Sequence, residues 1–213
     1  EESEVDRLKR NDREVLLDLY AKICNSFSYI LQERDEAEEA RQYLASRGIG
    51  AGMIGEFAIG YAPPDPSWLY TFLTSRNYSP EILEKSGLFS RNHATYPLFV
   101  DRIMFPIQDT RGRVIAFGGR TMDAGNSAKY INTPETILFR KRDNLFGFHQ
   151  ALDTIKKQGE VFVTEGYFDV IALAKSGVRN AVAPLGTAFT EDQARLLKRY
   201  AGKCVLLFDS DTA

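Results

Sequence analysis

Two short apolar segments, each followed at once by acidic residues, constrain the fold of this chain more than any other feature. Residues 161–163 (VFV) lead into Glu165, and residues 205–208 (VLLF) lead into the acidic segment 209–211 (DSD). Runs of aliphatic and β-branched residues between polar boundaries are typical of strands that are buried on both faces of a parallel sheet. We therefore predict two such strands, each with carboxylates at its carboxyl end.

Two helical patterns and a third apolar segment lie between these strands. Residues 167–175 and residues 190–200 have helical patterns, and the second begins with a capping box, Thr190 with Gln193 three residues later. The apolar segment 181–183 separates the two helices. Crossovers of this length between successive strands make the three strands parallel.

Parallel strands end at the same edge of a sheet, and open α/β sheets bind ligands at this edge. Glu165, Asp209 and Asp211 are therefore predicted to converge although they are distant in sequence. Clustered carboxylates repel one another unless a cation compensates their charge, and oxygen ligands without nearby His or Cys favour Mg²⁺ or Mn²⁺ over Zn²⁺. Asp169, in the first turn of the following helix, is a further acidic candidate. The alternative is that these acids only cap helices, which is the commoner use of a single Asp after a strand.

The composition is that of a soluble globular protein, and 213 residues suit one or two domains with buried cores. No segment is apolar for long enough to cross a membrane, and no signal peptide is evident, so we expect a cytoplasmic protein with no membrane partner. Cys24 lies in a helical pattern and Cys204 in a predicted buried strand, which excludes a CxxC metal site. His93 and His149 match no metal-ligand spacing, so zinc is not expected.

The net charge of −2 argues against a nucleic-acid-binding protein, but the distribution of charge does not. Residues 102–142 contain eight Lys and Arg residues against three Asp and Glu residues, a balance of 8 − 3 = +5. Within this segment, Lys129, Tyr130 and Asn132 combine a cation, an aromatic ring and an amide. This mixture suits contacts with phosphates and stacked bases, although a solvated basic loop would have the same composition.

The residues before this segment predict mainly helices and short strands. Residues 12–33 and 35–46 have amphipathic patterns, and Tyr43 falls on the core-facing side of the second helix. Short strands are predicted at residues 57–61 and 98–100.

A β-hairpin follows, with strands at residues 103–107 and 114–117. It leads into GGR at residues 118–120, where the glycines would let a ligand approach the backbone or would form a plain bulge or turn. We assign the fold to the α/β class: an α+β N-terminal subdomain, residues 1–158, followed by a Rossmann-like parallel-sheet module, residues 159–213.

The acidic motifs EGYFD (residues 165–169) and DSD (residues 209–211) resemble those of the TOPRIM module, which topoisomerases, certain nucleases and bacterial primases share. The blocks FAIGYAPP, DRIMFPI, FGGR, KYINTPET, FRK and LFG precede them in that order. Together these motifs resemble the RNA polymerase core of bacterial replicative DNA primase, the DnaG family. The resemblance covers about residues 40–213.

The resemblance implies roles for individual residues. Glu165, Asp209 and Asp211 would hold the catalytic divalent ions, and Asp169 would assist them. The positions that match the family's nucleotide-binding and nucleic-acid-binding ridge are Arg120, Lys129, Tyr130, Asn132 and Lys141. Arg47 and Arg102 match positions associated with the template groove.

The activity implied by the resemblance is template-directed synthesis of short RNA primers on single-stranded DNA, by metal-dependent nucleotidyl transfer during DNA replication. The implied partners are the single-stranded DNA template, ribonucleoside triphosphates, the RNA primer and, through a region outside this sequence, the replicative helicase. The implied metal is Mg²⁺ or Mn²⁺, and the implied location is the bacterial cytoplasm at the replication fork. Because the family's module continues beyond the second acidic motif, we expect this sequence to end inside that module.

Three other functions stay open at this stage. Another TOPRIM enzyme, a nuclease or a topoisomerase-like protein, would share the acidic motifs but not the upstream blocks. A phosphatase with a nucleophilic aspartate would match residues 205–212 loosely and leave EGYFD unexplained. A nucleic-acid-binding module without catalysis would use the carboxylates only as helix caps.

Overall fold

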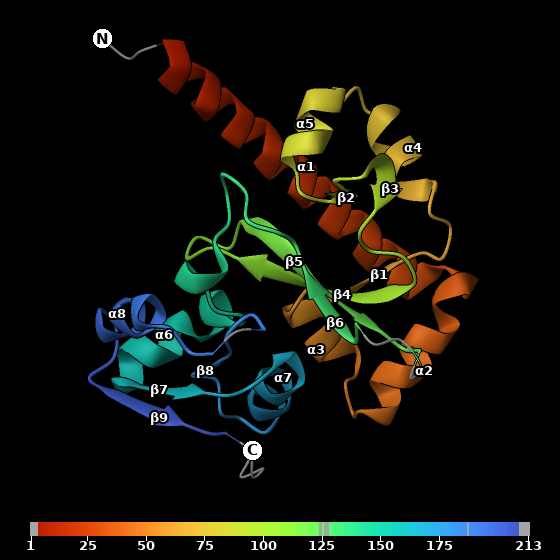
Figure 1. The fold of residues 1–213 in the computed structure, drawn as a ribbon. Helices are drawn as coiled ribbons and strands as arrows, with labels where there is room; N and C mark the ends of the chain where they lie inside the picture. Colours follow the sequence, from red (N-terminus) through yellow and green to blue (C-terminus); the bar gives the residue numbers. More distant parts are fainter. Residues whose placement is uncertain (1–3, 124, 126–127, 187, 209–213) are drawn as a thin grey trace.

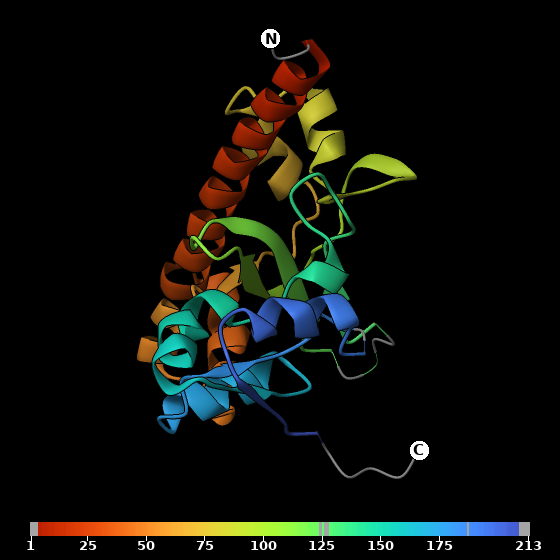
Figure 2. The ribbon, with the colours of Figure 1, turned by 90° about the vertical axis from the view of Figure 1, so that its left-hand side faces the viewer.

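The computed structural model describes residues 4–123, 125, 128–186 and 188–208. Helix α1 (Glu4–Glu33) is the longest element, and its N-terminal end projects beyond the rest of the molecule (Figure 1). A four-stranded antiparallel sheet lies against α1, and a three-stranded parallel sheet lies below it in the same view. Figure 2 shows α1 along one side of the antiparallel sheet and a small hairpin projecting on the other side.

The antiparallel sheet has the strand order β1-β4-β5-β6. Its strands are β1 (Gly60–Ala62), β4 (Arg102–Gln108), β5 (Val114–Thr121) and β6 (Tyr130–Asn132). The predicted hairpin is confirmed as β4 and β5, which pair along their whole length and turn at Gly112, whose φ is +78°. A positive φ at this position is the conformation that glycine adopts without strain.

Both central strands of this sheet are buried because each face is covered. On one face, Tyr20 and Phe27 of α1 pack on Phe117, with ring centroids 5.4 and 5.6 Å apart. On the other face, Tyr167 from the parallel-sheet part stacks on Phe105 at 5.0 Å. Every residue of β5 is buried as a result, and this burial contributes most of the favourable free energy of folding here.

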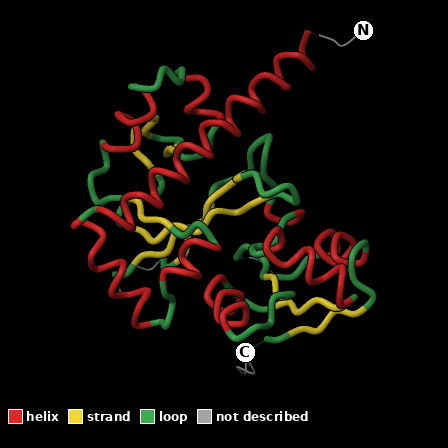
Figure 3. The backbone as a smooth tube through the Cα atoms, turned by 180° about the vertical axis from the view of Figure 1, so that it is seen from behind, coloured by secondary structure: helices red, strands yellow, loops and turns green. Residues whose placement is uncertain are grey.

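Short helices and a hairpin surround α1 (Figure 3). These elements are the 3₁₀ helix η1 (Asp35–Ala37), α2 (Glu38–Ser46), α3 (Ala51–Glu56), α4 (Trp68–Thr74), α5 (Pro80–Lys85), and the hairpin strands β2 (Phe89–Ser90) and β3 (His93–Pro97). None of the described helices combines the length and the apolar character that crossing a bilayer requires.

The C-terminal part is a parallel sheet with the order β8-β7-β9. Its elements are the 3₁₀ helix η2 (Lys141–Asp143), α6 (Phe148–Gln158), β7 (Glu160–Val163), α7 (Tyr167–Lys175), β8 (Ala181–Val182), α8 (Glu191–Lys198) and β9 (Lys203–Leu206). Residues of α6 and α8 form one apolar cluster with the sheet, whereas α7 packs into the main core. Both predicted helices and the parallel direction of the three strands are confirmed.

The predicted capping box of α8 is also confirmed. The hydroxyl oxygen of Thr190 accepts a hydrogen bond from the backbone N–H of Gln193 at 3.1 Å. In return, the side-chain oxygen of Gln193 accepts from the backbone N–H of Thr190 at 3.0 Å. The two bonds satisfy N–H groups that have no partner inside the helix.

The prediction that the second acidic strand is buried on both faces is wrong. β9 is the edge strand, and within the described residues it pairs only with β7. Leu206, Leu207 and Phe208 are therefore 53%, 41% and 47% exposed, and Cys204 is exposed as well. An apolar run does not distinguish a central strand from an edge strand, because strand order is a tertiary property.

Two short strands were also misplaced by the sequence patterns. The predicted strand at residues 57–61 begins only at Gly60, because helix α3 precedes it and Ala58 has a φ of +48°. Residues 98–100 are not a strand; the neighbouring strand is β3, and the chain turns at Asp101, whose φ is +50°. Positive φ angles at Ala and Asp are set by the surrounding packing and have no sequence signal.

The two cysteines should differ sharply in reactivity. Cys24 is buried in α1, and burial raises the pKa of its thiol to about 12, so almost no thiolate forms at pH 8. Cys204 is exposed, and partial burial raises the pKa of its thiol as well, so its advantage over Cys24 comes from access to the reagent. We expect the native protein to react with one equivalent of a disulfide reagent, at Cys204, and with a second only after denaturation. Reaction of Cys24 in native Cys204→Ser, at the rate seen after denaturation, would contradict this packing of α1.

Candidate functional site

Glu165 stands in the turn between β7 and α7, at the carboxyl end of the central strand of the parallel sheet. Its side chain is exposed. The chain after β9 continues beside this turn, because the N–H of Leu207 donates to the carbonyl of Val163 at 2.8 Å. Asp209 and Asp211 lie outside the described residues, so their convergence with Glu165 stays a prediction.

Asp169 has a structural task at the start of α7. One of its carboxylate oxygens accepts a hydrogen bond from the backbone N–H of Gly166 at 2.9 Å. The carboxylate also lies in the first turn of the helix, where the helix dipole favours negative charge. The capping interpretation thus accounts for Asp169, and its assistance to a metal ion stays a prediction.

A cavity of about 520 Å³ lies beside this turn. Its lining combines cationic, aromatic, amide and acidic side chains. The lining residues are Arg47, Arg120, Lys129, Tyr130, Asn132, Glu165, Gly166, Tyr167, Phe168, Asp169, Pro184 and Gly186. The structure therefore brings together seven of the residues singled out from the sequence, from α2's C-terminal end, the antiparallel sheet and the parallel module.

Arg120 packs among three aromatic rings. Its side chain is 7% exposed, and one terminal nitrogen donates to the hydroxyl of Tyr130. The guanidinium carbon lies 5.0, 5.1 and 5.0 Å from the ring centroids of Tyr43, Tyr130 and Phe168. Arg47 lies over two of the same rings, at 5.4 Å from Tyr43 and 6.0 Å from Phe168. Burial raises the pKa of Tyr130, so its hydroxyl stays protonated at neutral pH.

Asn132 connects the antiparallel sheet to the parallel module. Its amide oxygen accepts from the hydroxyl of Tyr167, and its amide nitrogen donates to the carbonyl of Leu185 at 2.9 Å. Burial raises the pKa of Tyr167, which keeps that hydroxyl a donor. The side-chain amide is thus engaged within the protein, while its predicted nucleic-acid contact stays a proposal.

The two glycines before Arg120 make room for side chains of the protein itself. A Cβ at Gly118 would lie 2.3 Å from the hydroxyl oxygen of Tyr167, and one at Gly119 would lie 2.6 Å from the ring of Phe99. Both glycines pair regularly with β4 and β6, so they form no bulge. The sequence suggested that these glycines either let a ligand approach the backbone or form a bulge. In the structure, side chains of the protein occupy the space next to both glycines.

Arg102 and Lys141 do not line the cavity. Arg102 is 7% exposed, and its terminal nitrogen donates to the carbonyl of Ala128 at 3.0 Å. Burial lowers the pKa of its guanidinium. This contact fixes the backbone next to Lys129, so Arg102 supports the cavity wall from behind. Its predicted contact with a template stays a proposal.

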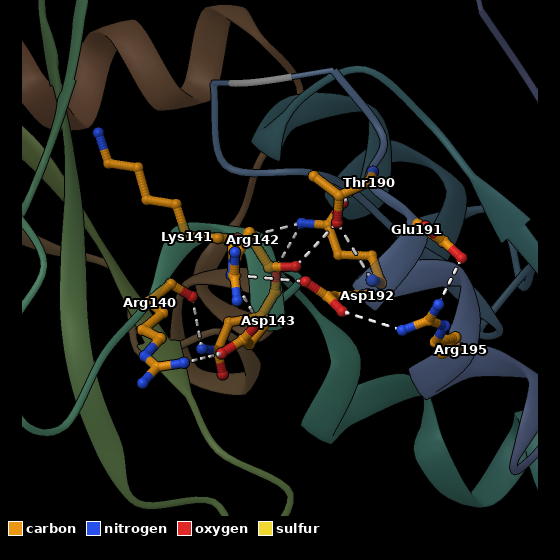
Figure 4. A network of polar contacts seen from close by, with 10 residues as sticks. Arg140, Lys141, Arg142, Asp143, Thr190, Glu191, Asp192 and Arg195 are labelled. Atoms are coloured by element: carbon orange, nitrogen blue, oxygen red, sulfur yellow. Dashed lines mark hydrogen bonds and ion pairs between the residues drawn. The ribbon is translucent and has the colours of Figure 1, made fainter.

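Lys141 belongs to the 3₁₀ helix η2, which packs against α8. The carbonyls of Lys141 and Arg142 accept from the side chains of Gln193 and Thr190, at 3.1 and 2.8 Å. Arg142 also pairs with Asp192 at 3.4 Å. In Figure 4 the side chain of Lys141 extends away from this network. The backbone of Lys141 is therefore fixed by this network, while its amino group lies outside the network.

The donor chemistry of the cavity suits a hard divalent cation. Among its lining residues the acidic ones are Glu165 and Asp169, and none is a His or Cys. Within the described residues, no three His, Cys, Asp or Glu side chains are placed to hold a metal ion. Oxygen ligands fit Mg²⁺ or Mn²⁺, and a complete ligand set would need Asp209 and Asp211 beside Glu165.

Tyr43 and Phe168 pack against the arginines of the site, although no sequence pattern marked them as functional. Helical spacing assigned Tyr43 to a core-facing position, and Phe168 stood between two selected residues without a role of its own. Tyr43 stands four positions before Arg47, so the two side chains share one helical face. This spacing could have indicated a ring–guanidinium contact, but only together with the aromatic residue at the start of α7.

Two family descriptions match this sequence. Residues 27–152 match the family described as DNA primase catalytic core, N-terminal domain, and residues 159–213 match the Toprim domain. The DNA primase of Treponema pallidum is 42% identical over 198 residues, which cover 93% of this chain and 33% of the relative. The DNA primase of Aquifex aeolicus is 41% identical over 193 residues, covering 90% and 38%. The chain thus spans about a third of the length of these curated relatives.

Solved structures of primases have the same fold. The RNA polymerase domain of Mycobacterium tuberculosis primase DnaG, in complex with double-stranded DNA, matches with a TM-score of 0.87 at 36% identity, covering 94% of this chain and 66% of that one. A DnaG primase catalytic domain bound to single-stranded DNA matches with a TM-score of 0.85 at 37% identity, covering 95% and 63%.

Gly118→Ala should weaken the contact between the two sheets. The added methyl group would overlap the hydroxyl of Tyr167, so we expect the free energy of unfolding to fall by about 1–3 kcal/mol. Gly52→Ala in α3 is the matched control, because a Cβ there meets no atom within 4 Å. Urea unfolding of the three proteins measures the difference, and equal stability of Gly118→Ala and the wild type would show that Tyr167 does not pack there.

Proposed function

The chain belongs to the DNA primase catalytic core family, and we propose on this basis that it carries out template-directed synthesis of short RNA primers on single-stranded DNA. One observation supports this most directly. A strand-end carboxylate, Glu165, and three cationic side chains, Arg47, Arg120 and Lys129, line the same cavity. Nucleotidyl transfer needs both kinds of group within one site, because it joins two anionic reactants.

The proposed reaction is attack of a primer 3′-hydroxyl on the α-phosphate of an incoming ribonucleoside triphosphate, with pyrophosphate as the leaving group. Arg47, Arg120 and Lys129 would bind the phosphates and hold the reacting oxygen in line. Tyr130 offers a partly exposed ring beside these cations, on which a base can stack. Orientation and electrostatic stabilisation by fixed groups would supply most of the rate acceleration.

Glu165, together with Asp209 and Asp211, would hold divalent ions. Bound there, Mg²⁺ or Mn²⁺ would lower the pKa of the attacking hydroxyl and neutralise charge on the phosphate oxygens. The carboxylate of Asp169 would keep the Gly166 turn in place, because it already accepts the N–H of that residue at 2.9 Å. Glu165, in the same turn, thereby lines the cavity.

The two proposed domains would supply different kinds of side chain to the site. Residues 1–158 would supply the cationic and aromatic groups, and residues 159–213 the acidic ones. The proposed ligands are single-stranded DNA, ribonucleoside triphosphates and the RNA primer, and the proposed location is the bacterial cytoplasm at the replication fork. The structures of related primase domains bound to single-stranded DNA and to double-stranded DNA support a nucleic-acid ligand. A helicase contact is proposed for regions of the protein outside this chain.

Glu165→Gln tests the acidic half of the site. The substitution keeps the size of the side chain but removes the negative charge that a divalent ion requires. We expect primer synthesis on single-stranded DNA, with Mg²⁺ and four ribonucleotides, to fall at least about a hundredfold. Glu84→Gln, on the exposed face of α5, is the matched control and should retain full activity.

Primer synthesis by Glu165→Gln at the wild-type rate would rule out the assigned role of this carboxylate. If Glu165→Gln and Asp209→Ala were both inactive in RNA synthesis but the protein cleaved DNA, a nuclease related to the TOPRIM enzymes would replace the primase assignment.

Lys129→Ala tests the cationic half. Removal of one phosphate contact should weaken binding of single-stranded DNA and reduce the slope of log K against log salt by about 0.7. Lys157→Ala, an exposed residue of α6 that does not line the cavity, should leave the slope unchanged. Fluorescence anisotropy at several salt concentrations measures the slopes, and identical slopes for both variants would exclude Lys129 from the DNA path.

A further inference from the structure

Two arginines of the cavity share one pair of aromatic rings. The guanidinium of Arg47 lies 5.4 Å from Tyr43 and 6.0 Å from Phe168, and that of Arg120 lies 5.0 Å from each. The two rings contact each other edge to face at 6.2 Å. The ion pairs that join described residues elsewhere in the chain do not include Arg47 or Arg120.

Aromatic rings fix the position of these arginines. A ring attracts a guanidinium through its quadrupole and carries no net charge of its own. The rings also restrict the rotamers of two long side chains, which lowers the entropy that a ligand must remove on binding. Two guanidiniums with fixed planes match the bidentate geometry of phosphate oxygens.

Unpartnered polar atoms gather in the same cluster. Among the described residues, the buried side-chain nitrogen and oxygen atoms without a hydrogen-bond partner are Nε of Arg120 and the hydroxyl oxygen of Tyr43. Both belong to one ring–guanidinium contact. Buried polar groups almost always have a partner, and Arg120 lines the cavity. A ligand or a water in that cavity would supply a partner for Nε of Arg120.

We propose that Tyr43 and Phe168 are positioning residues that fix Arg47 and Arg120 to receive the polyphosphate of a nucleoside triphosphate. This inference rests on the proposed function and assigns part of its substrate site. Tyr43 does not line the cavity, so it acts through the arginines. Phe168 lines the cavity and directly precedes Asp169, so the ring pair also links the arginines to the turn that presents Glu165.

The test uses inorganic tripolyphosphate without added metal, so that binding is measured apart from catalysis. Isothermal titration calorimetry should show about a tenfold higher Kd for Tyr43→Leu, because the ring that fixes both guanidiniums is lost. Tyr43→Phe retains the ring and should stay within about threefold of the wild type. Tyr29→Leu is the matched control: it removes a ring lying 5.6 Å from Arg34, outside the cavity, and should bind as the wild type does.

A second variant and a kinetic measurement separate positioning from folding. Phe168→Leu should raise the Kd for tripolyphosphate about fivefold. If Tyr43→Leu does not fold, this variant tests whether the rings position the arginines. In primer synthesis, both leucine variants should raise KM for ribonucleotides while kcat stays within about threefold of the wild type. A general loss of structure would lower kcat and the melting temperature instead.

Two results would overturn the proposal: tripolyphosphate binding by both leucine variants at wild-type affinity, or equal losses in Tyr43→Phe and Tyr43→Leu. The outcome is independent of the primase assignment. If the wild type made no RNA but bound tripolyphosphate in a ring-dependent manner, the proposed function would fail and the positioning role would stand. If the wild type made RNA and the leucine variants bound tripolyphosphate with wild-type affinity, only the positioning role would fail.

Discussion

The side chain of Tyr167 joins the two sheets, and the candidate site depends on this contact. Its ring stacks on Phe105 at 5.0 Å and meets Phe146 edge to face at 4.6 Å, while its hydroxyl donates to Asn132. Tyr167 is also the first residue of α7, two positions after Glu165. The same short turn therefore buries the ring and presents the carboxylate, so the position of Glu165 relative to the antiparallel sheet is set by aromatic packing and one buried hydrogen bond.

No single segment of the chain forms the site. Arg47 follows α2, Arg120 lies near the end of β5, and Lys129 precedes the edge strand β6, whereas Glu165 comes from the parallel module. Opposite charges are thus supplied by different parts of the fold, and the buried arginine packs against Tyr43 of one part and Phe168 of the other. This arrangement keeps a cationic wall and an acidic edge side by side, which is what a reaction between two anionic nucleic-acid components requires.

Features that depend on local sequence were predictable. The spacing of apolar residues gave the parallel strands β7 and β8, and the capping box gave the start of α8. Most candidate site residues were selected because their motifs resemble one family. Features that depend on tertiary packing could not be predicted. Helical spacing assigns Tyr43 to the core but does not indicate the guanidinium beside it. Nothing in the sequence around Gly118 indicates that the hydroxyl of Tyr167 occupies the space next to its Cα. The exposure of Cys204 follows from strand order, which periodicity does not encode.

In the proposed site, one cavity holds a divalent ion at its acidic side and a nucleotide polyphosphate at its cationic side. A crystal soaked with Mn²⁺ and a ribonucleoside triphosphate, with anomalous data collected for manganese, tests both parts in one experiment. The account predicts an anomalous peak coordinated by Glu165 and phosphate density beside Arg47 and Arg120. Manganese bound away from Glu165, or a triphosphate bound outside this cavity, would contradict it.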